Sequence, residues 1–175
     1  MAWKNNTYTE SVGGFYIEEN SNSLVAIGDK FHYIFKTDGK LIDILKLSES
    51  ISYKPIFFGF KVDDKNRISG TLSIVADKNN LTDQYMNSLI NLGFVSIENS
   101  LFYSEEIHGD RYKIEGNFSD VVNFDKSFKV EVSVPLTGTD IAKNIMVSPV
   151  TLVADVAIVT LAIPLGVLYG VSMNF

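Results

Sequence analysis

Alternating apolar and polar residues predict several short strands in the middle of the chain. The alternation is clearest at residues 68–75 and 128–134, where every second side chain is apolar or glycine. A period of two places successive side chains on opposite faces of a strand, one against a core and one in water. The pattern, with Gly, Asp and Asn at its interruptions, predicts strands at residues 24–27, 31–35, 55–62, 68–75, 94–97, 101–107, 111–118 and 128–134.

Turn and helix signals divide these strands. His108-Gly109-Asp110 is typical of a turn and is predicted to separate strands 101–107 and 111–118. Leu41, Ile42, Ile44 and Leu45 fit a short helix better than a strand. A clearer helix is predicted at about 83–92, with Thr82 as its cap, Gly93 as its stop and a buried stripe formed by Tyr85, Met86, Leu89 and Ile90.

The C-terminal part of the chain is strongly apolar. Asp155 is the single charged residue from Asn144 to Phe175. Ser148-Pro149 is a good helix start, which predicts an apolar helical segment at about 149–163 and beyond, bent or ended by Pro164. Three interpretations remain open: a membrane span, a helix buried against a sheet, or a segment lying on a membrane surface or a partner chain.

Together these patterns predict an α+β fold with a mainly antiparallel β-sheet, one clear helix (about 83–92) and the apolar C-terminal helix (about 149–163 and beyond). Three regions are expected along the chain. Residues 1–23 form an N-terminal arm or first strand, and residues 24–138 form the β-rich domain. Residues 139–175 form the hydrophobic segment, which could pack on the same domain.

Composition excludes some functions. The chain of 175 residues carries 15 basic and 21 acidic side chains, a net charge of −6, so nucleic acid is not an expected partner. It has no cysteine, hence no disulfide, thiolate nucleophile or cysteine-ligated metal. It lacks a phosphate-binding glycine loop and a Gly-x-Ser-x-Gly elbow, and His32 and His108 show no metal-binding spacing. We therefore predict no catalytic, metal or cofactor-binding residues, and not an enzyme.

Two acidic clusters are candidate sites. Residues 77–83 resemble the start of a calcium loop but lack its glycine and its final glutamate, so a turn that leads into a helix cap is favoured. Glu105, Glu106 and Asp110 form the candidate docking patch for a protein partner, against the simpler interpretation of a solvated edge. Adjacent residues on a strand face opposite sides, so Glu105 and Glu106 are poorly placed as an acid–base pair.

Two stretches carry a resemblance to a known class of proteins. Residues 24–35 (LVAIGDKFHYIF) and 146–155 (MVSPVTLVAD) are similar to segments of small, poorly characterised Gram-negative envelope lipoproteins. Those proteins carry a lipobox cysteine just before a short polar stretch, and Ala2-Trp3-Lys4 would fit after it. The resemblance implies no catalytic residues. It implies a periplasmic lipoprotein if Met1 replaces a processed leader, and otherwise a cytoplasmic protein with a membrane-associated tail.

Some lipoproteins of this kind are immunity proteins. The resulting hypothesis is a non-catalytic envelope protein that binds and neutralises a secreted toxin or effector, such as an envelope-targeting lipase, with no cofactor. A structural or lipid-contacting envelope protein is the first alternative. A single-span membrane protein with a soluble domain is the second, and a hydrolase that uses scattered carboxylates is the third.

Overall fold

The computed structural model describes residues 6–18, 21–115, 127–135, 145–147 and 159–160 of the chain. Of these residues 58% lie in strands and 19% in short helices and helical turns. The described part of the protein is therefore mostly β. The helices are short additions to one large sheet.

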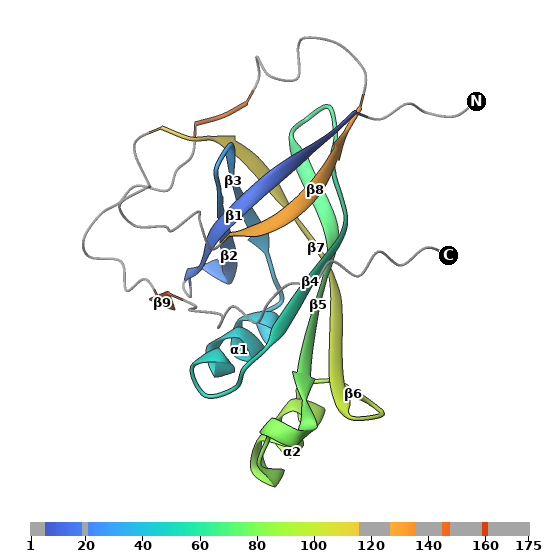
Figure 1. Cartoon of the computed structure of the whole chain (residues 1–175). Coiled ribbons are helices and arrows are strands. Elements are labelled where there is room, and N and C mark those ends of the chain that lie inside the picture. Colours follow the sequence, from blue (N-terminus) through green and yellow to red (C-terminus); the bar gives the residue numbers. More distant parts are fainter. Residues whose placement is uncertain (1–5, 19–20, 116–126, 136–144, 148–158, 161–175) are drawn as a thin grey trace.

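Seven strands close into a barrel (Figure 1). They follow the hydrogen-bonded order β2-β3-β7-β5-β4-β8-β1, and β1 pairs with β2 to complete the cylinder. All neighbours in the barrel are antiparallel except β4 and β8, which run parallel. The strands are β1 (Asn6–Glu18), β2 (Ser23–Gly28), β3 (Phe31–Lys36), β4 (Lys54–Val62), β5 (Arg67–Asp77), β7 (Ser100–Lys113) and β8 (Phe128–Val134).

The predicted fold class was wrong because the sheet closes on itself. The long strand β1 makes closure possible: its residues Asn6–Val12 pair with β8 and its residues Val12–Glu18 pair with β2. Pairing between β1 and β8 joins residues more than 100 positions apart in the sequence, which a local alternation pattern does not encode. The strand positions at 24–27, 31–35, 55–62, 68–75 and 128–134 are nevertheless confirmed.

The predicted turn at His108-Gly109-Asp110 was also wrong. Strand β7 continues through these residues, and Gly109 pairs with both Phe35 and Ile68. A β-carbon on Gly109 would lie 2.1 Å from the carbonyl oxygen of Ile34. The glycine therefore permits a close approach of two strands, which a sequence pattern cannot distinguish from a turn.

Two short α-helices connect strands. Helix α1 (Lys40–Lys46) starts after Gly39, whose φ of 89° is left-handed, and buries four apolar side chains. Helix α2 (Asp83–Asn91) matches the predicted helix, and the hydroxyl of Thr82 accepts a hydrogen bond from the backbone N–H of Tyr85. The described residues also include the helical turns η2 (Leu47–Glu49) and η3 (Lys78–Asn80). The Asp77 side chain caps η3 by accepting a hydrogen bond from the backbone N–H of Asn79, in agreement with the favoured turn interpretation.

Strands β5 and β7 extend beyond the barrel and form an arm (Figure 1). The short strand β6 (Val95–Ile97) pairs with the start of β7, and α2 lies at the tip of the arm. This places four neighbouring strands, β4-β5-β7-β6, in one surface that runs from the barrel wall onto the arm.

The predicted C-terminal helix falls mostly outside the described residues. Its one described part, Val159–Thr160, forms the short strand β9 and pairs with Tyr16 and Ile17 of β1, so the helix prediction is wrong there. Within the described ranges, no helix has the length and apolar character that crossing a membrane requires.

Candidate functional site

The barrel interior is a packed core that contains one buried polar network. Aromatic rings fill much of it: Phe15 stacks on Phe57 with ring centroids 5.6 Å apart. A cavity of about 30 Å³ beside Glu10 has room for about one water molecule. The interior of the described barrel therefore offers no space for an organic ligand.

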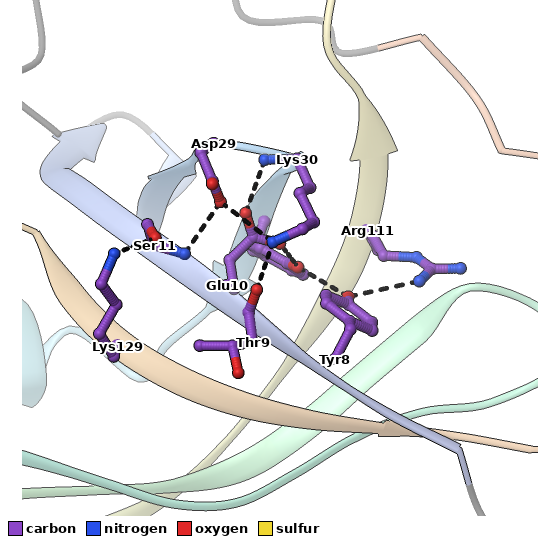
Figure 2. Close-up of polar contacts among 9 residues, drawn as sticks. Tyr8, Thr9, Glu10, Ser11, Asp29, Lys30, Arg111 and Lys129 are labelled. Carbon is purple, nitrogen blue, oxygen red and sulfur yellow. Dashed lines mark hydrogen bonds and ion pairs between the residues drawn. The ribbon is translucent and has the colours of Figure 1, made fainter.

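Glu10 is the centre of the polar network (Figure 2). Its side chain is fully buried and accepts hydrogen bonds from the Tyr33 hydroxyl at 2.5 Å and the Lys30 backbone N–H at 2.7 Å. Burial, with a smaller contribution from the nearby Asp29 carboxylate, raises the pKa of Glu10 to about 7, against the lowering effect of the two donors. Asp29 in turn accepts a hydrogen bond from the backbone N–H of Ser11 at 2.9 Å.

Arg111 of β7 lies at the other end of the network, close to Tyr8 (Figure 2). The Tyr8 and Tyr33 hydroxyls are 2.8 Å apart, and Nη1 of Arg111 donates to the Tyr8 hydroxyl at 3.3 Å. Nη2 of Arg111 donates to the side-chain oxygen of Asn66 at 2.7 Å, and the guanidinium lies 4.4 Å from the centre of the Phe31 ring. Each side chain of this hydrogen-bonded series bonds to a residue on another part of the barrel wall. The network therefore ties β1, β3 and β7 together.

The predicted acidic patch does not form one surface. All three residues lie on β7, but the Glu105 carboxylate accepts a hydrogen bond from the Tyr103 hydroxyl at 2.5 Å. Glu106 faces away from Glu105, as the strand periodicity predicts, and lies 3.8 Å from His108. Asp110 is half-buried and pairs across the sheet with Arg67 and Ile34. Glu106 and Asp110 share the outer face, and Glu105 is separate from them.

The two histidines are placed differently. His108 is exposed on the outer face of β7. His32 is fully buried, and this burial lowers its pKa to about 4, so the imidazole is neutral at physiological pH. Within the ranges that the structure describes, no three His, Asp or Glu side chains are grouped so as to hold a metal ion.

A concave region of about 750 Å³ lies on the outer surface beside the β4–β5 hairpin. Its lining is mixed in charge. In the hairpin, Nε and Nη2 of Arg67 contact Oδ2 of Asp63 at 2.7 and 2.6 Å. Despite partial burial, these contacts and two backbone N–H donors lower the pKa of Asp63. The other lining side chains include Lys61, Ser69, His108 and Pro135.

An apolar stripe crosses the surface next to this concavity. The strand register places Val75, Phe102 and Val95 in one row across β5, β7 and β6. Ile56 and Phe58 follow on β4, opposite Ser73 and Thr71. Phe58 is 74% exposed, Val95 60% and Ile56 42%. We call these five residues the outer stripe: Ile56, Phe58, Val75, Val95 and Phe102.

Sequence reasoning missed the outer stripe because of a bulge in β4. In a regular strand Phe58 and Phe60 would share a face, but the register shifts between Phe58 and Lys61, and Gly59 has a φ of 66°. Phe60 therefore points into the core against Gly70, whereas Phe58 points outward. Gly59, between Phe58 and Phe60, was the feature of the sequence that could have indicated the bulge.

Comparison with known proteins identifies a family for this chain. A family model described as the YidX N-terminal domain matches residues 4–135. That span contains all seven barrel strands and the arm. Neither the curated proteins nor the solved structures contain a significant match.

Proposed function

This chain belongs to the YidX N-terminal domain family, and we propose that it is a non-catalytic binding module that engages a protein partner through the outer stripe. A barrel filled by its own side chains serves as the scaffold, and the outer face carries the contacts. The deeper polar network holds the strands together and takes no part in binding.

The exposure of Phe58 carries this proposal. A phenylalanine that is 74% exposed contributes little to the core, and polar residues are common at such positions. Aromatic side chains are enriched at protein interfaces, where each buries a large area with few rotatable bonds. On the same face, Val75 and Phe102 of the two neighbouring strands lie nearer the arm, beyond the pair Ser73 and Ser104.

The surroundings of the outer stripe suit a protein interface. Polar residues border it on the same face: Ser73 and Ser104 share a hydrogen bond of 2.9 Å, and Glu106 pairs with Thr71 opposite Phe58. An apolar centre with a polar rim is the usual anatomy of an interface. The adjacent concavity of about 750 Å³ gives a recess for a projecting loop of the partner.

The partner we favour is a secreted toxin or effector with a basic surface, such as an envelope-targeting lipase. The resemblance of residues 24–35 and 146–155 to envelope lipoproteins, some of which are immunity proteins, supports this choice. A net charge of −6 would accelerate association with a basic protein by electrostatic steering. In this proposal the protein acts as a periplasmic lipoprotein and blocks access to the active site of the toxin.

Site-specific photo-crosslinking tests the interface. A benzophenone amino acid is placed at position 58 and, in a matched control, at Met146, which is 63% exposed and lies beside the far end of β7. Crosslinking in cells of the native host should give one discrete adduct from position 58 and none from position 146. The adduct is identified by mass spectrometry, and its purified partner is titrated with wild type, Phe58→Ser and Met146→Ser.

We expect Phe58→Ser to weaken binding by about 10- to 100-fold, as an interface anchor does, and Met146→Ser to leave it unchanged. Equal loss in both variants, or equal crosslinking from both positions, would contradict the proposal. A lipid adduct at position 58, with flotation on vesicles that is lost in Phe58→Ser, would establish the lipid-contacting alternative instead.

A further inference from the structure

Strand β6 forms one edge of the sheet on the arm (Figure 1). Its residues Val95–Ile97 pair with residues 100–102 of β7, and within the described ranges no strand pairs with the other side of β6. All three residues are exposed, Val95 by 60% and Ile97 by 52%. The free side of such a strand presents unpaired backbone N–H and C=O groups, which an extended segment of another chain can join.

The two faces of this edge differ in chemistry. Val95 lies opposite Phe102 of the outer stripe, so Val95 and Ile97 form an apolar outer face. Ser96 points to the inner face, because it lies opposite Leu101, which is buried in the core. A strand that joins this edge therefore meets apolar side chains on one face and a polar side chain on the other.

Lys78 places a positive charge on the inner face, beside the middle of β6. Its Nζ donates to the Ser96 hydroxyl at 2.6 Å and to the Glu98 backbone carbonyl at 2.5 Å. Both acceptors are neutral, and the ion pairs among the described residues do not include Lys78. An ammonium group has three donors, so one remains for an acceptor that arrives at the edge. Because Lys78 is half-buried, its attraction for a carboxylate is screened less than that of a fully exposed lysine.

We propose that the free edge of β6 binds an extended segment of a protein partner as an added antiparallel strand, and that this segment carries an acidic residue between two apolar residues. The β-carbons of opposite residues in an antiparallel pair lie about 4.5–5.5 Å apart. The partner residue opposite Ser96 therefore projects to the face that holds Lys78, where its carboxylate accepts the remaining donor in a charge-assisted hydrogen bond. The flanking apolar residues of the partner contact Val95 and Ile97.

Lys78 also argues against a second copy of this chain at the edge. Antiparallel pairing of two β6 strands centred on Ser96 would bring the two Lys78 ammonium groups to the same face of adjacent strands. Like charges in this arrangement repel each other, and a lysine beside an edge strand is a common protection against self-association. The same lysine thus disfavours basic strands and selects an acidic one.

The added strand would continue the surface β4-β5-β7-β6 and meet the outer stripe at Val95. The inference rests on the proposed function only in that both expect a protein partner. It does not require Phe58, which lies on β4, on the far side of β5 and β7. The two can therefore be tested separately.

Two cyclic β-hairpin peptides test the edge, one with Val-Glu-Val on its outer strand and one with Val-Lys-Val. Cyclisation holds the strand extended, so little affinity is lost in ordering it. Amide chemical shifts of the isotope-labelled full chain locate the binding. The glutamate peptide should shift the amides of Val95, Ser96 and Ile97 and should bind about tenfold more tightly than the lysine peptide. A glutamate peptide with N-methylated amides along its outer edge should not bind, because it cannot pair with a strand.

Three variants separate the charge from the rest of the surface. In Lys78→Met the two peptides should bind equally. Lys65→Met, which removes an exposed lysine from the β4–β5 hairpin, should keep the wild-type preference for glutamate, and so should Phe58→Ser. Thermal melts, compared with wild type, establish that each variant is folded.

The other outcomes count against the proposal. Unchanged β6 amides at millimolar glutamate peptide, or equal affinities of wild type for the two peptides, would overturn it. Dimerisation of wild type in sedimentation, with β6 amides that shift on dilution, would assign the edge to a second copy. Failed crosslinking from position 58 together with intact peptide binding would remove the outer stripe as an interface and leave the edge.

Discussion

The Glu10 carboxylate occupies the space next to Gly28 that a β-carbon would need. A β-carbon on Gly28 would lie 2.3 Å from Oε1 of Glu10 and 2.6 Å from the carbonyl oxygen of Phe31. This contact lets Glu10 reach the backbone N–H of Lys30 and join β1 to the turn between β2 and β3. The barrel is closed at this point by a side chain as well as by strand pairing.

Gly28→Ala should destabilise the protein by about 2–4 kcal/mol, because the methyl group displaces a buried carboxylate from its two donors. Urea unfolding followed by tryptophan or tyrosine fluorescence measures the change. Gly59→Ala is the control, because a β-carbon on Gly59 would have no atom within 4 Å. This substitution should cost only the backbone strain of its positive φ, about 1 kcal/mol. Equal losses in the two variants would show that the Glu10 contact is unimportant.

The raised pKa of Glu10 predicts a pH-dependent stability. In the unfolded chain this carboxyl titrates near 4.5, and in the folded protein near 7. Between these values the folded state holds the proton more tightly, so the free energy of unfolding falls as pH rises, by up to about 3 kcal/mol, and is then constant above pH 7. Below about pH 4.5 Glu10 adds no further pH dependence.

Comparison of wild type with Glu10→Gln isolates this effect. His32 has the opposite effect on stability. Its pKa is about 4 in the folded protein and 6.5 in the unfolded chain, so its contribution to the free energy of unfolding rises with pH between these two values. Since His32 is present in both proteins, the unfolding free energy of wild type minus that of Glu10→Gln should fall as pH rises from 4.5 to 7. The exposed Glu131→Gln on β8 should leave the wild-type profile unchanged, and a flat difference for Glu10→Gln would refute the assignment.

Arg111→Lys should destabilise the protein by about 1–3 kcal/mol. The buried guanidinium bonds to Tyr8 and Asn66 while it lies over the Phe31 ring, and an ammonium group cannot make this set of planar contacts. Arg67→Lys is the matched surface change, since the Arg67 side chain is 63% exposed, and it should lower the melting temperature much less than Arg111→Lys. Thermal unfolding of the two variants at one pH distinguishes them.

Phe58 and Phe60 should respond very differently to truncation. Phe60→Ala removes a buried ring that packs against Gly70 and should cost about 3–5 kcal/mol. Phe58→Ser should change the free energy of unfolding by less than about 0.5 kcal/mol, because its side chain is mostly in solvent. A large loss of stability from Phe58→Ser would show that the bulge at Gly59 does not turn this ring outward.

Local elements of this protein were predictable because their physical causes are local. The alternation in residues 68–75 placed Leu72 and Ile74 in the core, and the Thr82 hydroxyl marked the start of α2. These signals act within a few residues along the chain, where backbone geometry links side-chain periodicity to the structure.

Most strands, the start of α2 and the absence of cysteine chemistry follow from the amino-acid sequence alone. The barrel closure, the continuous β7 and the outward position of Phe58 depend instead on how the strands pair and pack in the folded protein. In the first two cases the cause is a neighbour that is distant in sequence, β8 beside β1 and the Ile34 carbonyl against Gly109, and in the third it is the shifted register between β4 and β5 at the bulge. Periodicity specifies which residues can share a face, whereas the packing of strands against one another decides whether that face meets the core, a second layer or solvent.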